Sequence, residues 1–358
     1  MISKTIRARP EVAQLESYVC ARDLYKKAGA FLDANENPFG SAVDYPGVSL
    51  NRYPDSDCTE LAGLLGGYCG AGEGQLLVGN GSDDIISIAA SAFCGAGDNV
   101  VTVQPGYSMW GVRSQVAGAT ERQALMTRDF ELDVDAVLDC VDSDTRIVFL
   151  ASPDAATGRP VGEASIRRLA REFNGMVFVD EAYFEFCGKT VRPLVDEFAN
   201  LIVSRTLSKA WGLAALRVGY CISSPGAIKV MRKIRFPYGV GTLSQILASK
   251  ALREGKARML ENVSAIMAER ERLSGGLRRL GLEVFPGQAN FVLVRFPEGI
   301  SSKEVQGRLA EEASIIVRDR SSLPMLGNCI RITVGTGEEN RRLAAELGRI
   351  LGKSFDGI

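Results

Sequence analysis

Five short apolar runs recur between residues 76 and 203, and each is followed by a polar or glycine-bearing turn. These runs are Leu76–Val78, Val100–Val103, Ile147–Leu150, Met176–Val179 and Leu201–Val203. Because they are apolar throughout, they are typical of parallel strands buried on both faces. Helical spacing follows at Asp83–Phe93 and Ser165–Phe173. The alternation predicts an α/β fold with a large, doubly wound, mostly parallel sheet, in which ligands bind at the carboxyl ends of the strands.

The pattern changes toward the C-terminus. Residues 243–280 form a long helical stretch rich in Ala, Leu, Glu and Arg, and residues 281–296 alternate like a pair of strands. A helix at Ser302–Ala313 and a strand at Ile330–Val334 follow. We therefore expect a smaller α+β domain in this part of the chain.

The N-terminal part is less regular. The first 45 or so residues lack a strong periodic element and are expected to pack as an N-terminal arm, and the glycine-rich segment 66–74 is expected to be a loop. We predict three units: an arm with part of the small domain at 1–45, a large domain at 46–262 and a small C-terminal domain at 263–358.

Composition limits the chemistry that the chain can perform. The sequence contains no histidine, which excludes histidine-based catalytic triads and every His-bearing zinc site. Any reaction must therefore use Lys, Asp, Glu, Tyr, Arg or a bound cofactor, and no metal is expected. The 42 basic and 43 acidic residues give a net charge of -1, so neither nucleic acid nor an anionic membrane is expected as a partner.

The sequence also bears on the compartment. No apolar run approaches the ~18 residues of a membrane span, and the first residues lack the apolar core of a secretion signal. The eight cysteines are scattered without a CxxC pair, which is typical of reduced thiols in a cytosolic protein. We therefore expect the protein in the cytoplasm.

A lysine follows the last apolar run, within the segment SRTLSKAWGLAALRVGY at residues 204–220. Lys209 lies beside Thr206 and Ser208, and Arg217 comes eight residues later. Lysine forms imines with carbonyl compounds, and hydroxyls with a guanidinium suit a phosphate dianion. A lone lysine is usually a solvated surface cation, so the interpretation depends on the flanking residues.

Two other segments place polar groups after apolar runs. Asp180 and Tyr183 follow Met176–Val179, where a carboxylate is costly unless it meets a cation or caps a helix. Gly79-Asn80-Gly81 precedes a helix that starts at Ser82, and helix starts attract phosphate. The third glycine of a dinucleotide-binding turn is missing, so that function is rejected.

Two acidic or aromatic residues near this turn have plainer alternatives. Asp83 could be an ordinary acid of a first helical turn, since negative charge stabilises a helix start. Tyr107 follows the run Val100–Val103 and could be a core aromatic residue. Taken alone, neither residue indicates a function.

Taken together, these segments resemble fold-type I pyridoxal-phosphate-dependent enzymes, and in particular the histidinol-phosphate aminotransferases. The lysine signature stands here as Thr206, Ser208, Lys209, Gly212, Leu213, Arg217 and Gly219. The stretches LDANENPFG (32–40), NRYPDSD (51–57) and IIVRDR followed by CIRITVGT (315–336) also resemble this family. The resemblance extends over nearly the whole chain and implies a large domain that binds the cofactor, a smaller α+β domain and an N-terminal arm.

The resemblance implies a role for each matching residue. Lys209 would bind pyridoxal 5'-phosphate covalently and move the substrate proton, Asp180 would pair with the ring nitrogen, and Tyr183 would hydrogen-bond the phenolic oxygen. The residues expected to hold the ring or the phosphate are Tyr107, Ser82, Asp83, Thr206, Ser208, Arg217 and, from the neighbouring subunit of a homodimer, Tyr53. The residues expected to bind the substrate are Arg331, Arg318, Tyr18 and Asn35.

The implied reaction is amino transfer between small molecules, from histidinol phosphate to 2-oxoglutarate, with glutamate as the product, in histidine biosynthesis. Relatives that decarboxylate amino-acid phosphates or transaminate other amino acids share the same lysine and aspartate, so both remain alternatives. A non-catalytic pyridoxal-phosphate-binding protein is a third alternative.

One loop departs from the family pattern. Residues 151–158 read ASPDAATG where the family has a sequence close to SPNNPTG, so Ala155 replaces an asparagine that donates to the cofactor's phenolic oxygen. Alanine has no side-chain donor, and an ionised Asp154 can only accept. The loop has either drifted, with a water replacing the amide, or marks a specialised or weakened enzyme.

Overall fold

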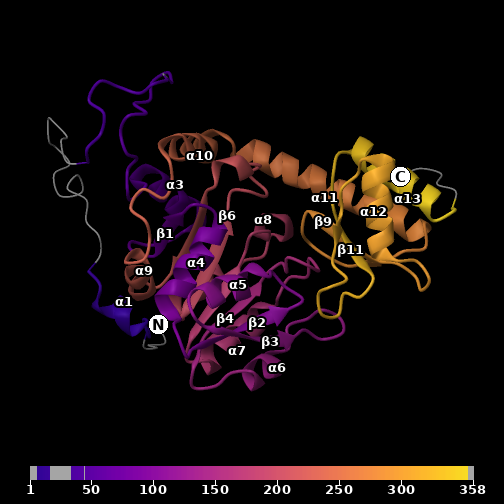
Figure 1. The fold of residues 1–358 in the computed structure, drawn as a ribbon, viewed down its shortest axis with the longest axis horizontal. Helices are drawn as coiled ribbons and strands as arrows, with labels where there is room; N and C mark the ends of the chain where they lie inside the picture. Colours follow the sequence, from indigo (N-terminus) through magenta and orange to yellow (C-terminus); the bar gives the residue numbers. More distant parts are fainter. Residues whose placement is uncertain (1–5, 17–33, 44, 354–358) are drawn as a thin grey trace.

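The computed structural model of the protein describes residues 6–16, 34–43 and 45–353 (Figure 1). Within these residues the chain forms a seven-stranded sheet and a four-stranded sheet. The strands of the larger sheet are β1 (Leu76–Gly79), β2 (Asn99–Gln104), β3 (Thr120–Leu125), β4 (Thr145–Ala151), β5 (Met176–Asp180), β6 (Leu201–Thr206) and β7 (Gly219–Ser223). The strands of the smaller sheet are β8 (Glu283–Phe285), β9 (Phe291–Arg295), β10 (Arg318–Asp319) and β11 (Cys329–Thr333).

The larger sheet has the strand order β1-β7-β6-β5-β4-β2-β3. Strands β6, β5, β4, β2 and β3 are parallel, and β7 is antiparallel to both β1 and β6. The carboxyl ends of β1, β2, β4, β5 and β6 therefore lie along one edge. All five apolar runs are strands, so the predicted α/β class is confirmed. The prediction missed β3, an edge strand with one buried residue, and the antiparallel β7.

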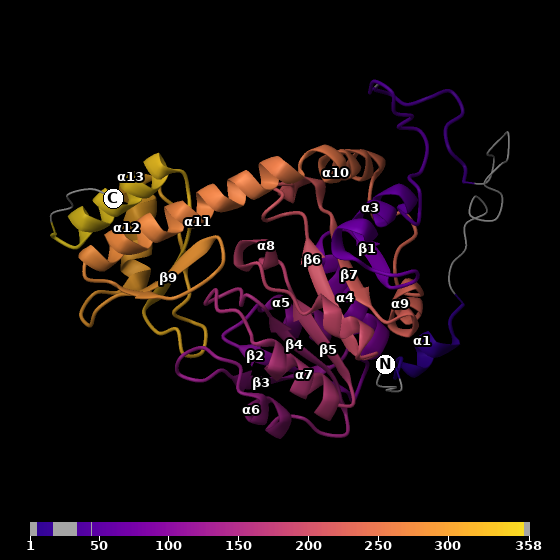
Figure 2. The same cartoon turned by 180° about the vertical axis from the view of Figure 1, so that it is seen from behind.

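Helices cover both faces of the larger sheet (Figures 1 and 2). On one face lie α4 (Ser82–Phe93), α5 (Met109–Val116) and α9 (Pro225–Arg232), whose buried side chains share an apolar cluster with the strands. On the other face lie α3 (Thr59–Cys69), α6 (Val134–Asp139), α7 (Glu163–Glu172) and α10 (Thr242–Glu254). This double cover explains why the strands have no polar face in the sequence.

The predicted helical stretch 243–280 is two helices, α10 and α11 (Lys256–Arg279), separated at Gly255. A Cβ on Gly255 would lie 2.8 Å from the carbonyl oxygen of Ala251, so the close approach at this junction requires glycine. Helix α11 continues from the larger sheet to the smaller one (Figure 2). The predicted boundary at 262 falls within this helix, and the three-unit division stays a prediction.

The smaller sheet has its own core. Residues of β9 and β11 pack with α11, α12 (Ser302–Ala313) and α13 (Gly337–Ile350) in a separate apolar cluster. The predicted strand pair in 281–296, the helix at Ser302–Ala313 and the strand near Ile330 are all present. The expectation of a smaller α+β unit in this region is therefore confirmed.

The expectation of a loop over 66–74 is wrong for its first half. Helix α3 continues to Cys69 because Leu61, Leu65 and Cys69 are spaced to bury one face of the helix. Gly70 ends the helix in the left-handed conformation, with φ of +67°, which is a common role for glycine. Only the residues after Gly70 form the expected connector.

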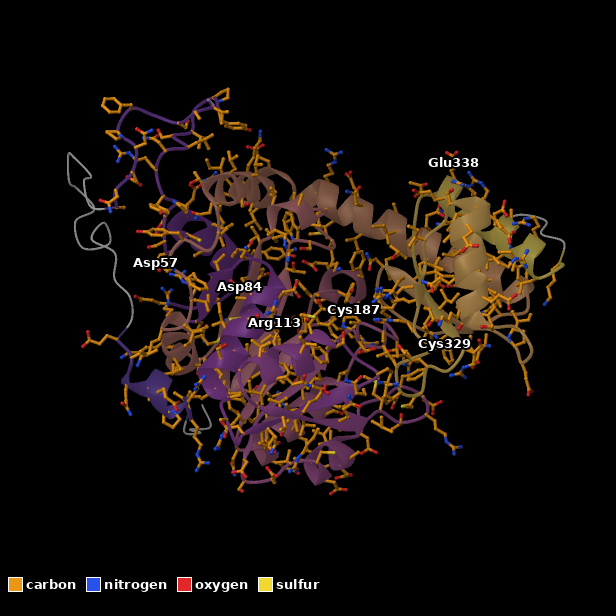
Figure 3. The ribbon with its side chains drawn as sticks, viewed as in Figure 1. Asp57, Asp84, Arg113, Cys187, Cys329 and Glu338 are labelled. Atoms are coloured by element: carbon orange, nitrogen blue, oxygen red, sulfur yellow. The ribbon has the colours of Figure 1, made fainter. Side chains whose placement is uncertain are left out.

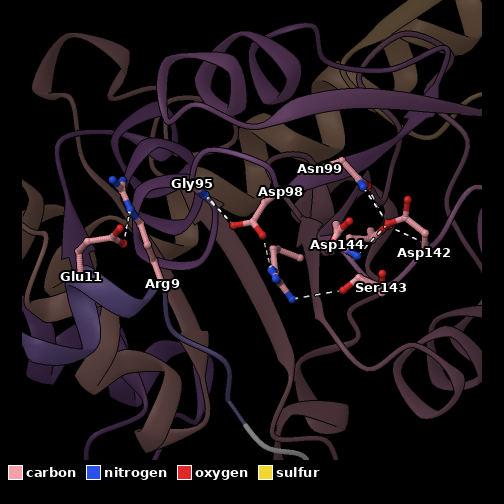
Figure 4. Close-up of polar contacts among 10 residues, drawn as sticks. Arg9, Glu11, Gly95, Asp98, Asn99, Asp142, Ser143 and Asp144 are labelled. Atoms are coloured by element: carbon pink, nitrogen blue, oxygen red, sulfur yellow. Dashed lines mark hydrogen bonds and ion pairs between the residues drawn. The ribbon is translucent and has the colours of Figure 1, made fainter.

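Polar contacts tie the amino ends of β2 and β4 together (Figure 4). The Asn99 amide donates to Asp142 at 2.8 Å, and the Asp98 carboxylate accepts from the backbone N–H of Gly95 at 2.8 Å and from Arg146 at 2.7 Å. These contacts fix the amino ends of the strands. A ligand site is expected at the opposite edge, where the carboxyl ends of the strands lie.

Two further properties of the described residues concern their helices and their thiols. None of their helices is both long enough and apolar enough to cross a membrane. Their seven cysteines are free thiols, five of them buried. No disulfide joins any two of these seven thiols.

Candidate active site

The turn between β1 and α4 approaches β7 very closely. Gly219 pairs with both Gly79 and Thr206, and a Cβ on Gly219 would overlap the backbone at Gly81 and Ser82. Gly81 has a φ of +84°, which favours glycine, and it leaves room for the guanidinium of a neighbouring arginine. Two glycines thus bring the first N–H groups of α4 next to the end of β6.

Charged and aromatic side chains surround the start of α4. The Asp83 carboxylate accepts a hydrogen bond from the Tyr107 hydroxyl at 2.8 Å and lies 3.3 Å from the Arg217 guanidinium. Burial, followed by the contact with Asp83, raises the pKa of Tyr107. Arg217 has a φ of +53°, an unfavourable conformation for a residue with a side chain. The structure therefore brings together Ser82, Asp83, Tyr107 and Arg217, whose roles in holding a cofactor stay a prediction.

Thr206 and Ser208 lie at the end of β6, beside that turn. The Thr206 hydroxyl donates to the Ser208 hydroxyl at 2.9 Å and accepts from the Ser208 backbone N–H at 3.1 Å. The loop closes on itself where the N–H of Gly212 donates to the carbonyl of Lys209 at 3.0 Å. Together with Arg217 and the start of α4, these hydroxyls offer several donors to an anion.

Lys209 lies between this turn and the end of β5. Its side chain is exposed, and among the described residues it has no ion pair. The Nζ atom lies 5.5 Å from the centroid of the Tyr183 ring. Tyr183 is buried and packs edge-to-face on Phe291 of the smaller sheet, with centroids 5.5 Å apart.

Asp180 ends β5 with a buried carboxylate. Its Oδ1 atom accepts from the N–H of Ala182 at 3.1 Å, but no cation forms an ion pair with it among the described residues. Burial raises the pKa of Asp180 from 3.8 to about 7, and the positive charge of Lys209 only partly opposes this effect. A positively charged ligand group beside Asp180 would relieve the cost of burying this charge.

A buried ion pair, which the sequence reasoning missed, lies next to Asp180. Arg205 and Glu181 are 2.9 Å apart with side chains 4% and 1% exposed. The Thr190 hydroxyl donates to Glu181 at 2.8 Å and accepts from Arg205 at 2.6 Å. Because Glu181 follows Asp180 and Arg205 precedes Thr206, the pair fixes the ends of β5 and β6 relative to each other. The sequence signal for this ion pair was a charged residue next to each of the two motifs, Glu181 after Asp180 and Arg205 before Thr206.

The loop after β4 differs from its family pattern but is ordered by Asp154. One carboxylate oxygen accepts from the N–H groups of Ala156 and Thr157 and from the Thr157 hydroxyl, at 2.7–2.9 Å, while the other has no partner among the residues that the structure describes. Burial raises the pKa of Asp154, although these donors oppose the effect. Ala155 is buried, and its carbonyl accepts from Arg331 at 2.6 Å.

The two predicted substrate arginines are neighbours across β10 and β11. Arg318 and Arg331 are directly paired in the ladder. The Arg331 guanidinium lies 5.1 Å from the Phe291 ring, whereas Arg318 is exposed. Arg331 thus reaches the edge of the larger sheet, on the same side as Tyr183.

The predicted N-terminal residues are not joined to this group. Tyr18 lies outside the described residues. Asn35 is exposed, and Tyr53, 51% exposed, stacks on Tyr238 with centroids 4.5 Å apart. Within the described ranges, no hydrogen bond, ion pair or ring contact joins Tyr53 or Asn35 to Lys209. The segment that contains them extends away from the body of the molecule near α3 and α10 (Figure 1).

Comparison with known proteins identifies relatives over most of the chain. The family model for class I and II aminotransferases matches residues 34–347. The chain is 35% identical to the histidinol-phosphate aminotransferase of Flavobacterium johnsoniae over 347 residues, which cover 95% of this chain and 96% of the relative. It is 38% identical to the enzyme of the same name from Cytophaga hutchinsonii over 340 residues, or 94% and 95% of the two chains.

A solved structure gives the same result. Histidinol-phosphate aminotransferase from Sinorhizobium meliloti, in complex with pyridoxal-5'-phosphate, matches with a TM-score of 0.79 and 26% identity, covering 98% of this chain and 99% of that one. The fold is therefore that of the fold-type I aminotransferases, as the sequence predicted. Since the family model spans most of the chain and both relatives exceed 30% identity over nearly their full length, the protein belongs to the class I and II aminotransferases.

Proposed function

We propose that the protein is a pyridoxal-phosphate-dependent aminotransferase that transfers the amino group of histidinol phosphate to 2-oxoglutarate, in histidine biosynthesis. The observation that carries the proposal is the convergence of Lys209, Asp180 and the donors around α4 at one edge of the sheet. The names of the relatives at 35% and 38% identity support the choice of substrate.

The residues present fit the cofactor on three counts. The buried Asp180 carboxylate, with its pKa of about 7, forms no ion pair with any described residue, and a protonated pyridine nitrogen would supply a cation. Thr206, Ser208, Arg217 and the N–H groups of Ser82 and Asp83 would hold the phosphate. Lys209 has a free amine for the covalent bond, and Tyr183 beside it would donate to the phenolic oxygen. Tyr107 would stack on the ring.

Each side chain then has a defined task. When bound, pyridoxal 5'-phosphate supplies the electron sink for the carbanion formed at the substrate. Asp180 would keep the proton on the ring nitrogen, and Lys209 would remove the substrate's α-proton and deliver it to the cofactor carbon rather than back to the substrate, as amino transfer requires. Arg331, with Arg318 beside it in the ladder, would hold the anionic end of either substrate, and the family roles of Asn35 and Tyr18 in lining the pocket stay predictions. The substrates are therefore small anionic amines and oxo acids.

The exposed Tyr53 supports the further proposal of a homodimer, with Tyr53 reaching the partner's cofactor phosphate. The biosynthetic role proposed from the relatives supports a cytoplasmic location. Mixing protomers tests this assembly. A Lys209→Ala chain supplies an intact Tyr53, and a Tyr53→Ala chain supplies an intact Lys209. If Tyr53 acts across the interface, mixed dimers recover activity above that of either variant alone; no recovery after verified subunit exchange would contradict the proposal.

A turnover panel tests the proposed reaction. The cofactor-loaded enzyme is supplied with 2-oxoglutarate and, in turn, histidinol phosphate, several amino acids and amino-acid phosphates. The proposal predicts glutamate formation fastest with histidinol phosphate, no activity in Lys209→Ala, and unchanged activity in Lys229→Ala, which changes an exposed lysine on α9. Release of CO₂ without glutamate would identify a decarboxylase, and cofactor binding without turnover would identify a non-catalytic protein.

A further inference from the structure

A third arginine lies beside the two that the sequence predicted. Arg320 follows β10, and its N–H donates to the carbonyl of Cys329 at 2.9 Å, which extends the β10–β11 ladder by one pair. Side chains two residues apart on a strand, and those directly opposite across a ladder, share one face. Arg318, Arg320 and Arg331 are therefore on the same face of the smaller sheet.

That face is turned toward the larger sheet. Cys329, on the same face, belongs to the apolar cluster of the larger sheet, whereas Ile330 and Ile332 belong to the core of the smaller unit. Figure 3 labels Cys329 on the side of the small unit that faces the larger sheet. Arg331 on this face contacts Ala155 and lies over Phe291, against which Tyr183 packs.

The three arginines have no ion-pair partner in the described part of the chain. None of the three arginines forms an ion pair there, and the buried Nε of Arg320 has no hydrogen-bond partner. Burial, and then the charges of Arg331 and Arg318, lower the pKa of Arg320 to about 10, while Asp154 and Tyr183 oppose the effect. A partly buried guanidinium without an ion pair, beside two further positive charges, is costly unless an anion binds there.

We propose that Arg320 is a specificity-determining residue that, together with Arg331, binds the phosphate dianion at the far end of the amino substrate. The inference rests on the proposed function, in which the two substrates carry a phosphate and a carboxylate respectively. A carboxylate of charge -1 can be held by Arg331 alone, whereas a dianion offers more oxygens and charge for a second guanidinium. Arg320 thus favours the phosphate-bearing substrate over glutamate.

Binding of inorganic phosphate to the cofactor-loaded enzyme, measured by calorimetry, tests Arg320 without requiring turnover. The cofactor's own phosphate occupies the donors at the start of α4. Binding of added phosphate therefore reports on the substrate end of the site. Arg320→Gln should weaken phosphate binding roughly ten-fold or more, the effect of losing one charged hydrogen bond. The control Arg258→Gln, at an exposed arginine of α11, should leave it unchanged. Equal phosphate affinity in the wild type and Arg320→Gln would overturn the inference.

Kinetics provide the second measurement. Arg320→Gln should raise the KM for histidinol phosphate by a similar factor with little change in kcat, and should change the KM for glutamate much less. If histidinol phosphate is not a substrate, the proposed function fails, and the phosphate titration still decides the role of Arg320.

A wild-type experiment covers the case in which Arg320→Gln does not fold. Phenylglyoxal modifies accessible arginines, and peptide mapping locates the label. Phosphate should slow the modification of Arg320 and not that of Arg258. Equal rates for Arg320 with and without phosphate would contradict the proposal.

Discussion

Replacing Asp180 with asparagine should stabilise the cofactor-free protein and should lower the turnover of the cofactor-loaded protein. Without cofactor the Asp180 carboxylate is buried and forms no ion pair in the described part of the chain. Its pKa rises from 3.8 to about 7. Each pKa unit corresponds to about 1.4 kcal/mol, so ionising this group at pH 8 costs the folded state up to about 4 kcal/mol. Relaxation and water entry reduce that figure. The amide of the Asp180→Asn variant would stay neutral and could keep the hydrogen bond from Ala182.

The sign of the pH dependence follows from the raised pKa. The folded cofactor-free protein retains a proton on Asp180 that the unfolded chain has released between about pH 4 and pH 7. The contribution of the Asp180 proton to the free energy of unfolding is fully present below pH 4 and is lost as the pH rises through 7. Cofactor-free Asp180→Asn should therefore be more stable than wild type at pH 8, with a difference that shrinks toward pH 4.

Denaturant midpoints of both cofactor-free proteins from pH 4 to pH 8 measure this difference. Glu185, whose pKa burial also raises to about 7, is present in both proteins and cancels in the comparison. Asp129→Asn, at an exposed carboxylate, is the matched control and should show little change. With cofactor, Asp180→Asn should lower turnover far more than cofactor affinity. A cofactor-free variant that is no more stable at pH 8 would refute the reasoning.

Three further changes test other parts of the site. Gly219→Ala should cost about 1–3 kcal/mol of stability and weaken cofactor binding, because its Cβ overlaps the turn before α4. Gly307→Ala, in open space on α12, is the control and should have neither effect. Equal denaturant midpoints for the two variants would contradict the close approach at Gly219. Arg331→Ala should raise the KM of both substrates tens-fold, since a charged hydrogen bond contributes about 1.5–3 kcal/mol; unchanged glutamate kinetics would exclude it from the pocket. Ala155→Asn should lower the pKa of the nitrogen that joins Lys209 to the cofactor by about one to two units in a visible-light titration; an unmoved curve would mean that the residue does not tune the chemistry.

Hydrophobic periodicity predicted the buried part of the fold well. Strands β4 and β5 each contain an uninterrupted apolar run because helices cover both faces of the sheet, so the sequence pattern reports their burial directly. Strand β3 has one buried residue and carries no such signal. The break at Gly255 depends on a contact with the preceding turn of helix, which periodicity does not report.

The candidate site was predicted where it follows strands and missed where it depends on pairing. Asp180, Lys209 and Ser82 come directly after apolar runs, so their meeting at one edge follows from a parallel sheet. Arg205 and Glu181, which form an ion pair, are distant in sequence, and so are Arg320 and Arg331, which share one face of the smaller sheet. Only the strand register reveals them.

The measurement that tests the central claim most directly is the location of the covalently bound cofactor. The purified, cofactor-loaded protein is reduced with borohydride, digested and mapped by mass spectrometry. The account predicts a yellow protein before reduction and the cofactor's mass on the peptide that contains Lys209, with none in Lys209→Ala. Label on another lysine, or no label in a protein saturated with cofactor, would contradict the account.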